Sequence, residues 1–356
     1  MVHGQRRNEA QLLRAVGAAL AVVILVWTFR DTQPHRVAEL LGRVGAAGVV
    51  LLLLPQLLSL AVESFGWRMA FRAMGHRLPY LGLFRARIAS EALAQTLPLG
   101  TLVCESMKPL LLARTCGADL STSLAGMAAR KWLLVGSQTL YLGGFCLLSW
   151  PLLTRISPDV LGGAGLPWLL GAMTLLWLLL ALAGYGMLAR GRVAERLYTW
   201  LCSWPWPWLK LRLQSSRYKF SNTDGQLQSF FASTLKSPLP LLPFLGGWLL
   251  EACETFLILW LLGVNLSWTT VGAMEVSASF LRNVAFVVPA GLGVQDLSYL
   301  TFLRALHVPD ALNVAAAFLL LKRSKECFWA ACGYVVLALE LRESALPKRL
   351  EPTQSC

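Results

Sequence analysis

Long apolar runs separated by short polar segments are the main pattern along the chain. Six of the runs come close to the roughly 20 residues that a helix needs to cross the hydrocarbon core of a bilayer. They lie near 13–29, 44–62, 120–150, 166–189, 239–262 and 311–341. The pattern predicts an all-α polytopic membrane protein with about six full spans, and we expect the first span to be retained rather than cleaved.

Two further apolar segments, 80–113 and 271–303, are interrupted near the middle by proline and glycine. The interruptions contain Pro98, Gly100, Pro289, Gly291 and Gly293. Because proline and glycine end helices, we expect each segment to form a re-entrant helical hairpin that returns to the side from which it entered. Free backbone groups at this depth need protein or water as partners, so each break should line a polar cavity.

The two hairpins belong to an internal repeat whose offset is 191 residues, the separation of Pro98 and Pro289. The same offset relates Glu63 to Glu254, Glu105 to Asp296, and Lys131 to Lys322. Charged residues are rare and costly inside a membrane, so these matches mean more than matches of alanine. We place the first copy of the repeat at about 44–150 and the second at about 239–341.

The expected topology separates the two copies by an odd number of crossings, which makes them an inverted internal repeat. Transporters commonly have this arrangement, with a binding site near the membrane midplane where the copies meet and helices are broken. The alternative is an ancient duplication that is retained for packing alone. The broken helices favour the transport interpretation.

Composition and charge limit the possible functions further. The chain has 356 residues, 56% of them hydrophobic and 14% charged. The longest polar interval, 190–237, is shorter than the roughly 100 residues of an independent domain, so we expect it to be a loop or surface helix within one transmembrane domain over 1–356. With both termini in the cytoplasm, most lysines and arginines face the cytoplasm, including those of a basic 190–237 loop, as the positive-inside rule requires. The net charge of +13 then faces anionic lipids, and no nucleic-acid partner is expected because the basic residues are spread over short loops.

Charged side chains inside the apolar runs are the candidate functional residues. Glu63 and Glu254 lie within such runs, and Lys131 and Lys322 are the cations expected beside them. The cluster is extended by Arg130, Glu251, Arg323, Lys325 and Glu326. Burial favours the neutral form of a carboxylate unless a cation is near, so the set allows either proton coupling or an internal ion pair that holds the bundle together. For the symmetric set as a whole, a functional cavity is favoured.

The helices that follow the two breaks are candidates for binding an anion. Their free N–H groups and positive dipole ends favour an anionic group such as a lipid phosphate. Glu105 and Asp296 lie in the first turn after each break, where they either serve that site or simply cap the helix. Arg282, within the second hairpin, is a further candidate for contacting phosphate.

Nothing in the sequence indicates catalysis or metal binding. No nucleophile with an adjacent base is apparent, the four histidines fall near expected helix ends or loops, and the eight cysteines form no paired C-x-x-C. We therefore expect no enzyme activity, no cofactor and no metal.

Three short motifs resemble one known family. They are Leu97-Pro98-Leu99-Gly100 with Glu105, Pro289-Ala290-Gly291-Leu292-Gly293-Val294-Gln295-Asp296, and Lys322-Arg323 before Gly333. With these motifs the chain resembles the flippase-like transmembrane domain of bacterial lysylphosphatidylglycerol synthases, as a stand-alone member without the aminoacyl-transferase domain. The resemblance implies a protein of the bacterial cytoplasmic membrane that moves lipids or lipid-linked head groups between leaflets, or supports an enzyme that modifies them.

Three functions therefore remain open. The leading hypothesis is a lipid translocator that binds an anionic head group between its two hairpins, with membrane lipids as its partners. The second is a non-catalytic scaffold that docks a lipid-modifying or glycosyl-transferring enzyme through the basic 190–237 loop. The third is a transporter of a small ion or solute on the same architecture.

Overall fold

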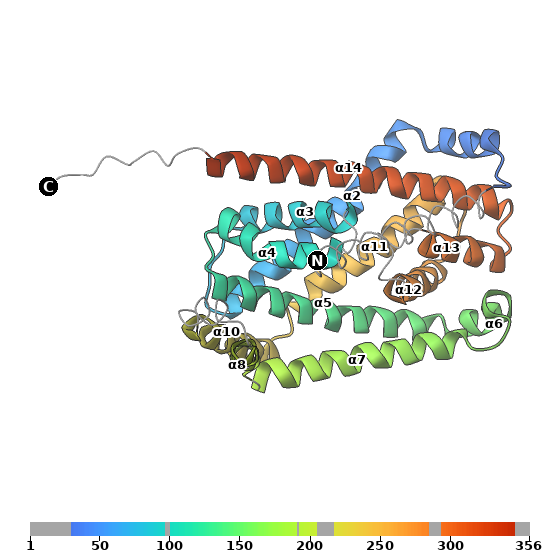
Figure 1. The fold of residues 1–356 in the computed structure, drawn as a ribbon. Helices are drawn as coiled ribbons and strands as arrows, with labels where there is room; N and C mark the ends of the chain where they lie inside the picture. The colour runs from blue at the N-terminus through green and yellow to red at the C-terminus, as the bar shows by residue number, and fades with distance from the viewer. Residues whose placement is uncertain (1–29, 97–99, 191, 205–216, 285–292, 346–356) are drawn as a thin grey trace, which may run out of the picture.

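The computed structural model describes residues 30–96, 100–190, 192–204, 217–284 and 293–345, and all regular structure in these ranges is α-helical (Figure 1). The first half of the chain forms α2 (Pro34–Ala73), α3 (Tyr80–Thr96), α4 (Gly100–Cys116), α5 (Leu120–Leu148), α6 (Trp150–Leu161) and α7 (Leu166–Arg190). The second half forms α8 (Val193–Ser203), α10 (Arg217–Lys236), α11 (Leu241–Leu261), α12 (Trp268–Val284), α13 (Val294–Ala305) and α14 (Ala311–Ala345). The expected all-helical membrane class is confirmed.

Three helices in the described ranges, α2, α7 and α11, are each long and apolar enough to cross a membrane. A fourth crossing is obtained if α5 and α6, which meet at an angle of 85°, count as one span. The run at 13–29 lies outside the described residues. The run at 311–341 forms the single helix α14, but Lys322, Arg323 and Lys325 interrupt its apolar surface. Six full spans therefore stay a prediction.

Helix α2 begins earlier and ends later than the run at 44–62 indicated. Pro34 occupies its first turn, where the missing N–H of proline costs nothing. The helix bends at Gly45, whose φ of 63° is a conformation that glycine adopts without strain. At the other end the helix continues beyond the apolar run through Arg68 and Arg72. Their long side chains can reach the polar interface from a helix end, which explains why charge did not terminate the helix.

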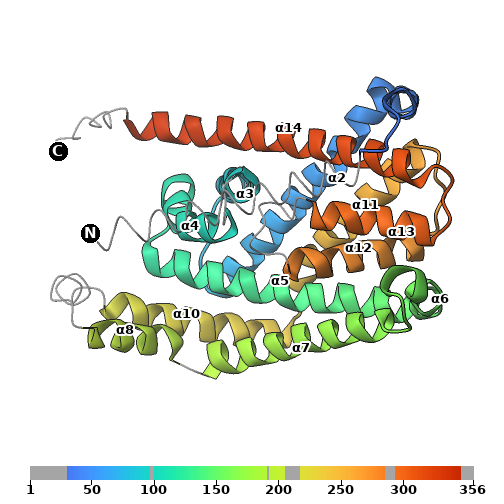
Figure 2. The same cartoon turned by 45° about the vertical axis from the view of Figure 1, so that its right-hand side comes forward.

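The 191-residue offset relates α2 to α11, α3 to α12, α4 to α13 and α5 to α14, in the same order. Helices α5 and α14 begin at Leu120 and Ala311, which are also 191 residues apart. In both views the colours show α2 and α11 crossing side by side in opposite directions, and α5 and α14 also run in opposite directions (Figures 1 and 2). Helices α3 and α4 lie towards one end of the bundle and α12 and α13 towards the other. Opposite directions are compatible with an inverted repeat.

The four helices of the expected hairpins are short. Helices α3, α4 and α12 each have 17 residues and α13 has 12. At 1.5 Å per residue, none of them is long enough to cross roughly 30 Å of hydrocarbon alone. The breaks at 97–99 and 285–292 lie outside the described residues, so the re-entrant hairpins stay a prediction.

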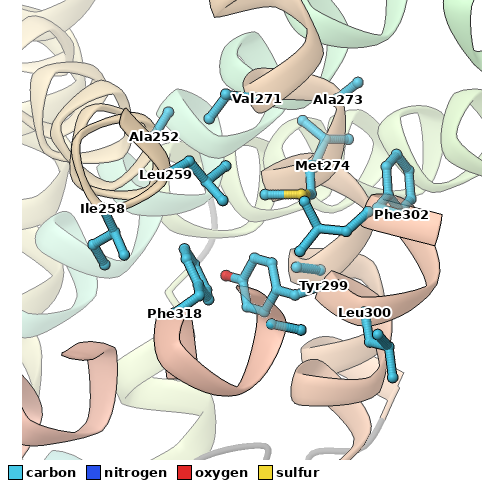
Figure 3. Packing of buried hydrophobic residues seen from close by; sticks show 14 of the residues in the cluster. Ala252, Ile258, Leu259, Val271, Ala273, Met274, Tyr299, Leu300, Phe302 and Phe318 are labelled. Atoms are coloured by element: carbon cyan, nitrogen blue, oxygen red, sulfur yellow. The ribbon is translucent and has the colours of Figure 1, made fainter. Parts of the chain in front are cut away.

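Two apolar clusters hold the helices together. One contains Trp67 and Phe71 of α2, and the indole N–H of Trp67 donates to the carbonyl oxygen of Gly126 on α5 over 2.9 Å. The other contains Tyr299 of α13 and Phe318 of α14, whose ring centres lie 4.8 Å apart (Figure 3). These clusters fix the helices that carry the charged residues described below.

The described part of the 190–237 interval is helical and forms α8 and α10. The carboxylate of Asp224 on α10 accepts hydrogen bonds from the backbone N–H groups of Ala194 and Glu195, at 2.9 and 3.0 Å, in the first turn of α8. Phe230 and Phe231 pack against Trp132 of α5. An apolar stripe on α10 meets the bundle and stabilises the helix, a contact that a largely polar composition does not indicate.

Candidate functional site

A polar cavity of about 370 Å³ lies between helices of both copies of the repeat, within segments that are otherwise apolar. Its walls come mainly from α2, α3, α5, α11 and α14. The charged residues that line it are Glu63, Arg87, Glu91, Arg130, Lys131, Glu251, Glu254, Lys322, Lys325 and Glu326. Carboxylates and cations are equal in number in this lining, so the cavity wall as a whole is neutral when all groups are ionised.

The first copy of the repeat contributes a buried ion-pair network around Glu63 of α2. Its Oε2 accepts from Arg87 Nε of α3 at 3.1 Å and from Arg130 Nη2 of α5 at 2.9 Å. Arg87 also pairs with Glu91, one turn further along α3. The side chain of Gln95 donates to the other oxygen of Glu91 over 3.0 Å. Two carboxylates and two guanidinium groups thus neutralise one another within the bundle.

Packing fixes the orientation of these groups. The guanidinium carbon of Arg130 lies 5.5 Å from the ring centre of Trp67 and 6.0 Å from that of Phe244, within the range of cation–π attraction. On α11, Gly247 faces the Glu63 carboxylate so closely that an added Cβ would lie 3.1 Å from Oε1. The absence of a side chain at Gly247 lets α11 approach α2 at the level of the cavity.

The second copy contributes a corresponding network around Glu254 of α11. Its Oε2 accepts from Lys325 Nζ at 2.6 Å, and its Oε1 lies 3.9 Å from Lys322 Nζ. Lys322 also lies 3.8 Å from Oε1 of Glu275, which α12 places behind the cavity wall. Tyr299 donates to the same oxygen of Glu275 over 2.8 Å, as does the hydroxyl of Thr255. Both lysines therefore come from α14 and both carboxylates from its neighbours.

Several buried atoms of this second network have no hydrogen-bond partner among the described residues. They are Glu254 Oε1, Glu275 Oε2 and Lys322 Nζ. Native proteins leave few buried polar atoms unsatisfied, because each costs about 1–3 kcal/mol or more for a charged group. Such a concentration beside a cavity is typical of a place where a ligand, a proton or water completes the network.

Eight of the charged residues proposed from the sequence line this cavity: Glu63, Arg130, Lys131, Glu251, Glu254, Lys322, Lys325 and Glu326. One pairing differs from the expectation, because Arg130 rather than Lys131 contacts Glu63. The two positions are adjacent on α5 and point in directions about 100° apart, so only one of them can face α2. Lys131 instead is exposed and lines the cavity with its ammonium group available.

Four other proposed residues, Glu105, Gly293, Asp296 and Arg323, lie outside the cavity lining. Glu105 pairs with Lys108 on its own helix at 2.6 Å. Asp296 accepts from the backbone N–H of Gly293 at 3.0 Å and from Arg323 Nη2 at 2.6 Å. Gly293 has a φ of 80° at the start of α13, so glycine is required there. The capping interpretation thus describes the contacts of Asp296, while Arg323 joins it to the cavity residue Glu326 at 2.6 Å.

The remaining proposed residues are not placed by the structure. Pro98, Pro289 and Gly291 lie outside the described residues. Gly100 is the first residue of α4, and Arg282 belongs to α12, but the surroundings of neither side-chain position are described. The predicted anion site at the two breaks stays a prediction.

Sequence reasoning missed Arg87, Glu91 and Glu275. The repeat comparison could not find them, because the offset of 191 residues places Ala278 opposite Arg87 and Phe84 opposite Glu275. A signal was nevertheless present. Arg87 and Glu91 have the i,i+4 spacing of a helical ion pair, and Glu275 is a lone acid within an apolar segment.

Within the described part of the chain, no group of three or more His, Cys, Asp or Glu side chains has the arrangement that holds a metal. Four carboxylates of the cavity, Glu63, Glu91, Glu254 and Glu326, are instead paired with lysine or arginine, which repels a metal cation.

Comparison with known proteins agrees with the motifs. Among curated proteins, none matches the chain. The family model described as the lysylphosphatidylglycerol synthase TM region matches residues 14–320. This stretch contains all the charged cavity-lining residues named above except Lys322, Lys325 and Glu326 of α14. The helices long enough to span a membrane lie within the same stretch. The chain is a multi-pass membrane protein and belongs to the lysylphosphatidylglycerol synthase transmembrane-region family.

Proposed function

We propose that this protein moves a lipid, or a lipid-linked head group, between the leaflets of the bacterial cytoplasmic membrane, with both termini in the cytoplasm. The observation that carries the proposal is the cavity of about 370 Å³, which holds ten charged side chains between apolar helices. Charged groups inside a membrane are costly and usually mark the path of a substrate. Membership of a family named for a lipid synthase supports a role in membrane lipid biology.

The physical basis of the proposal is solvation of the head group. A charged head group that crosses hydrocarbon alone loses its hydration at great cost, whereas a polar cavity replaces part of that hydration. Lys131 supplies an exposed cation in the cavity wall for an anionic phosphate. The acyl chains remain in the bilayer, beside apolar surfaces such as the exposed Leu175, Leu176 and Leu179 of α7.

The predicted re-entrant hairpins form part of the same proposal. In it, α3 with α4 and α12 with α13 enter the membrane from opposite faces and return without crossing. The short helices and their positions towards opposite ends of the bundle support this arrangement. Two half-crossings of opposite direction would give the head group access to the cavity from either leaflet in turn. No catalytic step is required.

Reconstitution in liposomes tests the proposal. Vesicles of phosphatidylethanolamine and phosphatidylglycerol would contain fluorescently labelled phosphatidylglycerol, and dithionite would report the fraction accessible from outside over time. We expect the protein to accelerate exchange between leaflets, and Lys131→Gln to slow it at least several-fold. Lys236→Gln, at an exposed position of α10 away from the cavity, is the matched control. Exchange no faster than in empty vesicles would refute translocation of this lipid class.

A competition arm separates lipid transport from transport of a small solute. Glycerophosphoglycerol carries the same phosphodiester group as phosphatidylglycerol without acyl chains. If it is taken up by the vesicles, and if it slows lipid exchange at equal concentration, the small-solute alternative is favoured. We expect neither result, because the exposed apolar faces beside the cavity favour a substrate with acyl chains.

The exposed face of α8 favours a second candidate function, the non-catalytic scaffold. Arg192, Arg196 and Trp200 are exposed there, and Trp200 retains 53% of its accessible surface. Aromatic and arginine side chains are enriched where proteins bind one another. Replacing these three residues should release a docked lipid-modifying or glycosyl-transferring enzyme if the protein is a scaffold, and should leave lipid exchange unchanged if it is a translocator.

A further inference from the structure

Glu275 on α12 is the most deeply buried carboxylate next to the cavity, with 1% of its surface exposed. Its Oε1 accepts hydrogen bonds from Tyr299 and Thr255 and lies 3.8 Å from Lys322 Nζ. Its Oε2 has no hydrogen-bond partner among the described residues. A second buried acid, Glu254, shares Lys322 with it. Two acids that compete for one lysine form an arrangement whose charge changes when a single proton binds.

The groups around Glu275 come from every helix that packs against α12. Helix α11 presents Thr255, Glu254 and the negative charge of Glu251, while α13 presents Tyr299 and α14 presents Lys322. Helices α5 and α7 complete the surroundings with apolar side chains, Phe145 against Gly272 and Trp177 in the same apolar cluster. The nearest cation is thus Lys322, which also lines the cavity and connects Glu275 to it.

The charges of the cluster determine what it can bind. Glu254 and Glu275 offset Lys322 and Lys325, so these four residues form a cluster that is neutral when both acids are ionised, and the negative charge of Glu251 beside it disfavours a bound anion further. Adding an anionic head group to this neutral cluster would leave an uncompensated negative charge in a low-dielectric interior, which is strongly unfavourable. One proton on Glu275 would remove that obstacle.

We propose that Glu275 is a proton-binding site whose loading is linked to the binding of an anionic head group. This inference rests on the proposed function. Water in the cavity gives one proton to a carboxylate oxygen of Glu275, the cluster gains one positive charge, and Lys322 is left to pair with Glu254 and the head group. On the other side of the membrane the head group leaves and Glu275 returns its proton to water. The loaded and the empty cluster are then both neutral, and only neutral states change access.

Proton uptake by the purified protein tests the linkage without requiring translocation. The full-length protein in detergent and weak buffer, with a pH indicator, would be titrated with dihexanoyl phosphatidylglycerol. We expect uptake of about one proton per lipid bound. Glu275→Gln should abolish the uptake, whereas Glu275→Asp, which keeps a carboxylate, should restore it. Glu340→Gln is the control, because Glu340 is also buried and paired with an arginine but does not line the cavity.

Two results would overturn the proposal: lipid binding by the wild-type protein without proton uptake, or undiminished uptake by a folded Glu275→Gln variant that elutes as wild type from a size-exclusion column. Equal loss of uptake in Glu275→Gln and Glu340→Gln, without recovery in Glu275→Asp, would also count against the proposal. A vesicle arm separates this inference from the proposed function. Exchange that ignores an imposed pH gradient refutes the coupling alone. Proton-linked lipid binding without any exchange refutes translocation and leaves the proton site standing.

Discussion

At the scale of single residues, the buried charges of the cavity are arranged so that each has an opposite partner. Arg130 and Lys131 show how sharply position decides the outcome, because they are neighbours on α5 but only Arg130 is buried against Glu63. Composition alone predicts the same behaviour for both residues. Their surroundings predict very different consequences of removal.

We expect Arg130→Ala to lower the free energy of unfolding by about 3 kcal/mol or more, because it leaves part of the Glu63 charge unpaired in the interior. Lys131→Ala should change stability by less than about 0.5 kcal/mol, as is usual for an exposed side chain without a special contact. Thermal unfolding in detergent, followed by tryptophan fluorescence, measures the difference. Equal losses for the two adjacent variants would show that the Glu63 network does not stabilise the protein.

At the scale of helices, close packing depends on glycine at particular positions of α5. A Cβ at Gly126 would overlap the ring of Phe71 on α2, whereas a Cβ at Gly144 would meet open space. We expect Gly126→Ala to destabilise by about 1–3 kcal/mol through overpacking. Gly144→Ala should be neutral or stabilising by up to about 1 kcal/mol, because alanine favours the helix. Unfolding curves of the two variants compare one substitution on one helix, and an equal effect would contradict the α2–α5 contact.

The cap that joins α8 to α10 makes a separate prediction at this scale. Asp224→Ala removes the acceptor of two backbone N–H groups in the first turn of α8 and should cost about 0.5–2 kcal/mol. Hydrogen exchange of residues 193–203 should accelerate, while exchange in α11 stays unchanged. Asp224→Asn keeps one acceptor oxygen and should show an intermediate effect. Unaltered exchange in Asp224→Ala would mean that α8 is held by other contacts.

A helix could be predicted from the sequence where its local residues determine it, and could not be predicted where contacts with other helices determine it. The run at 166–189 matches α7 and the run at 239–262 matches α11 to within two residues, because an uninterrupted apolar run specifies a helix without help from its neighbours. The packing of α10 against the bundle could not be predicted, since it depends on Phe230 and Phe231 meeting α5. Glu275 was missed for a similar reason: only the fold brings it to Lys322.

At the scale of the whole molecule, the two copies of the repeat converge on one neutral cavity with different residues. Glu63 is neutralised by arginines from α3 and α5, and Glu254 by two lysines from α14 alone. The offset of the sequence therefore predicts where the acids lie but not which cations accompany them. What both halves share is the requirement that buried charge sums to zero.

That requirement can separate the stability of the protein from its transport. Lys325→Met leaves Glu254 with Lys322 at 3.9 Å and without its hydrogen-bonded partner, and should cost about 3–5 kcal/mol. In the double variant Lys325→Met with Glu254→Gln the charge is balanced again, so the total loss should be smaller than the sum of the single losses by about 0.5–3 kcal/mol. If the cavity serves transport, the double variant should remain folded yet exchange lipid slowly. If the charges serve only to hold the bundle together, the double variant should recover exchange along with stability. The packing of α11 against α14 would then require only that the pair at positions 254 and 325 is neutral, whether it is an ion pair or two uncharged side chains.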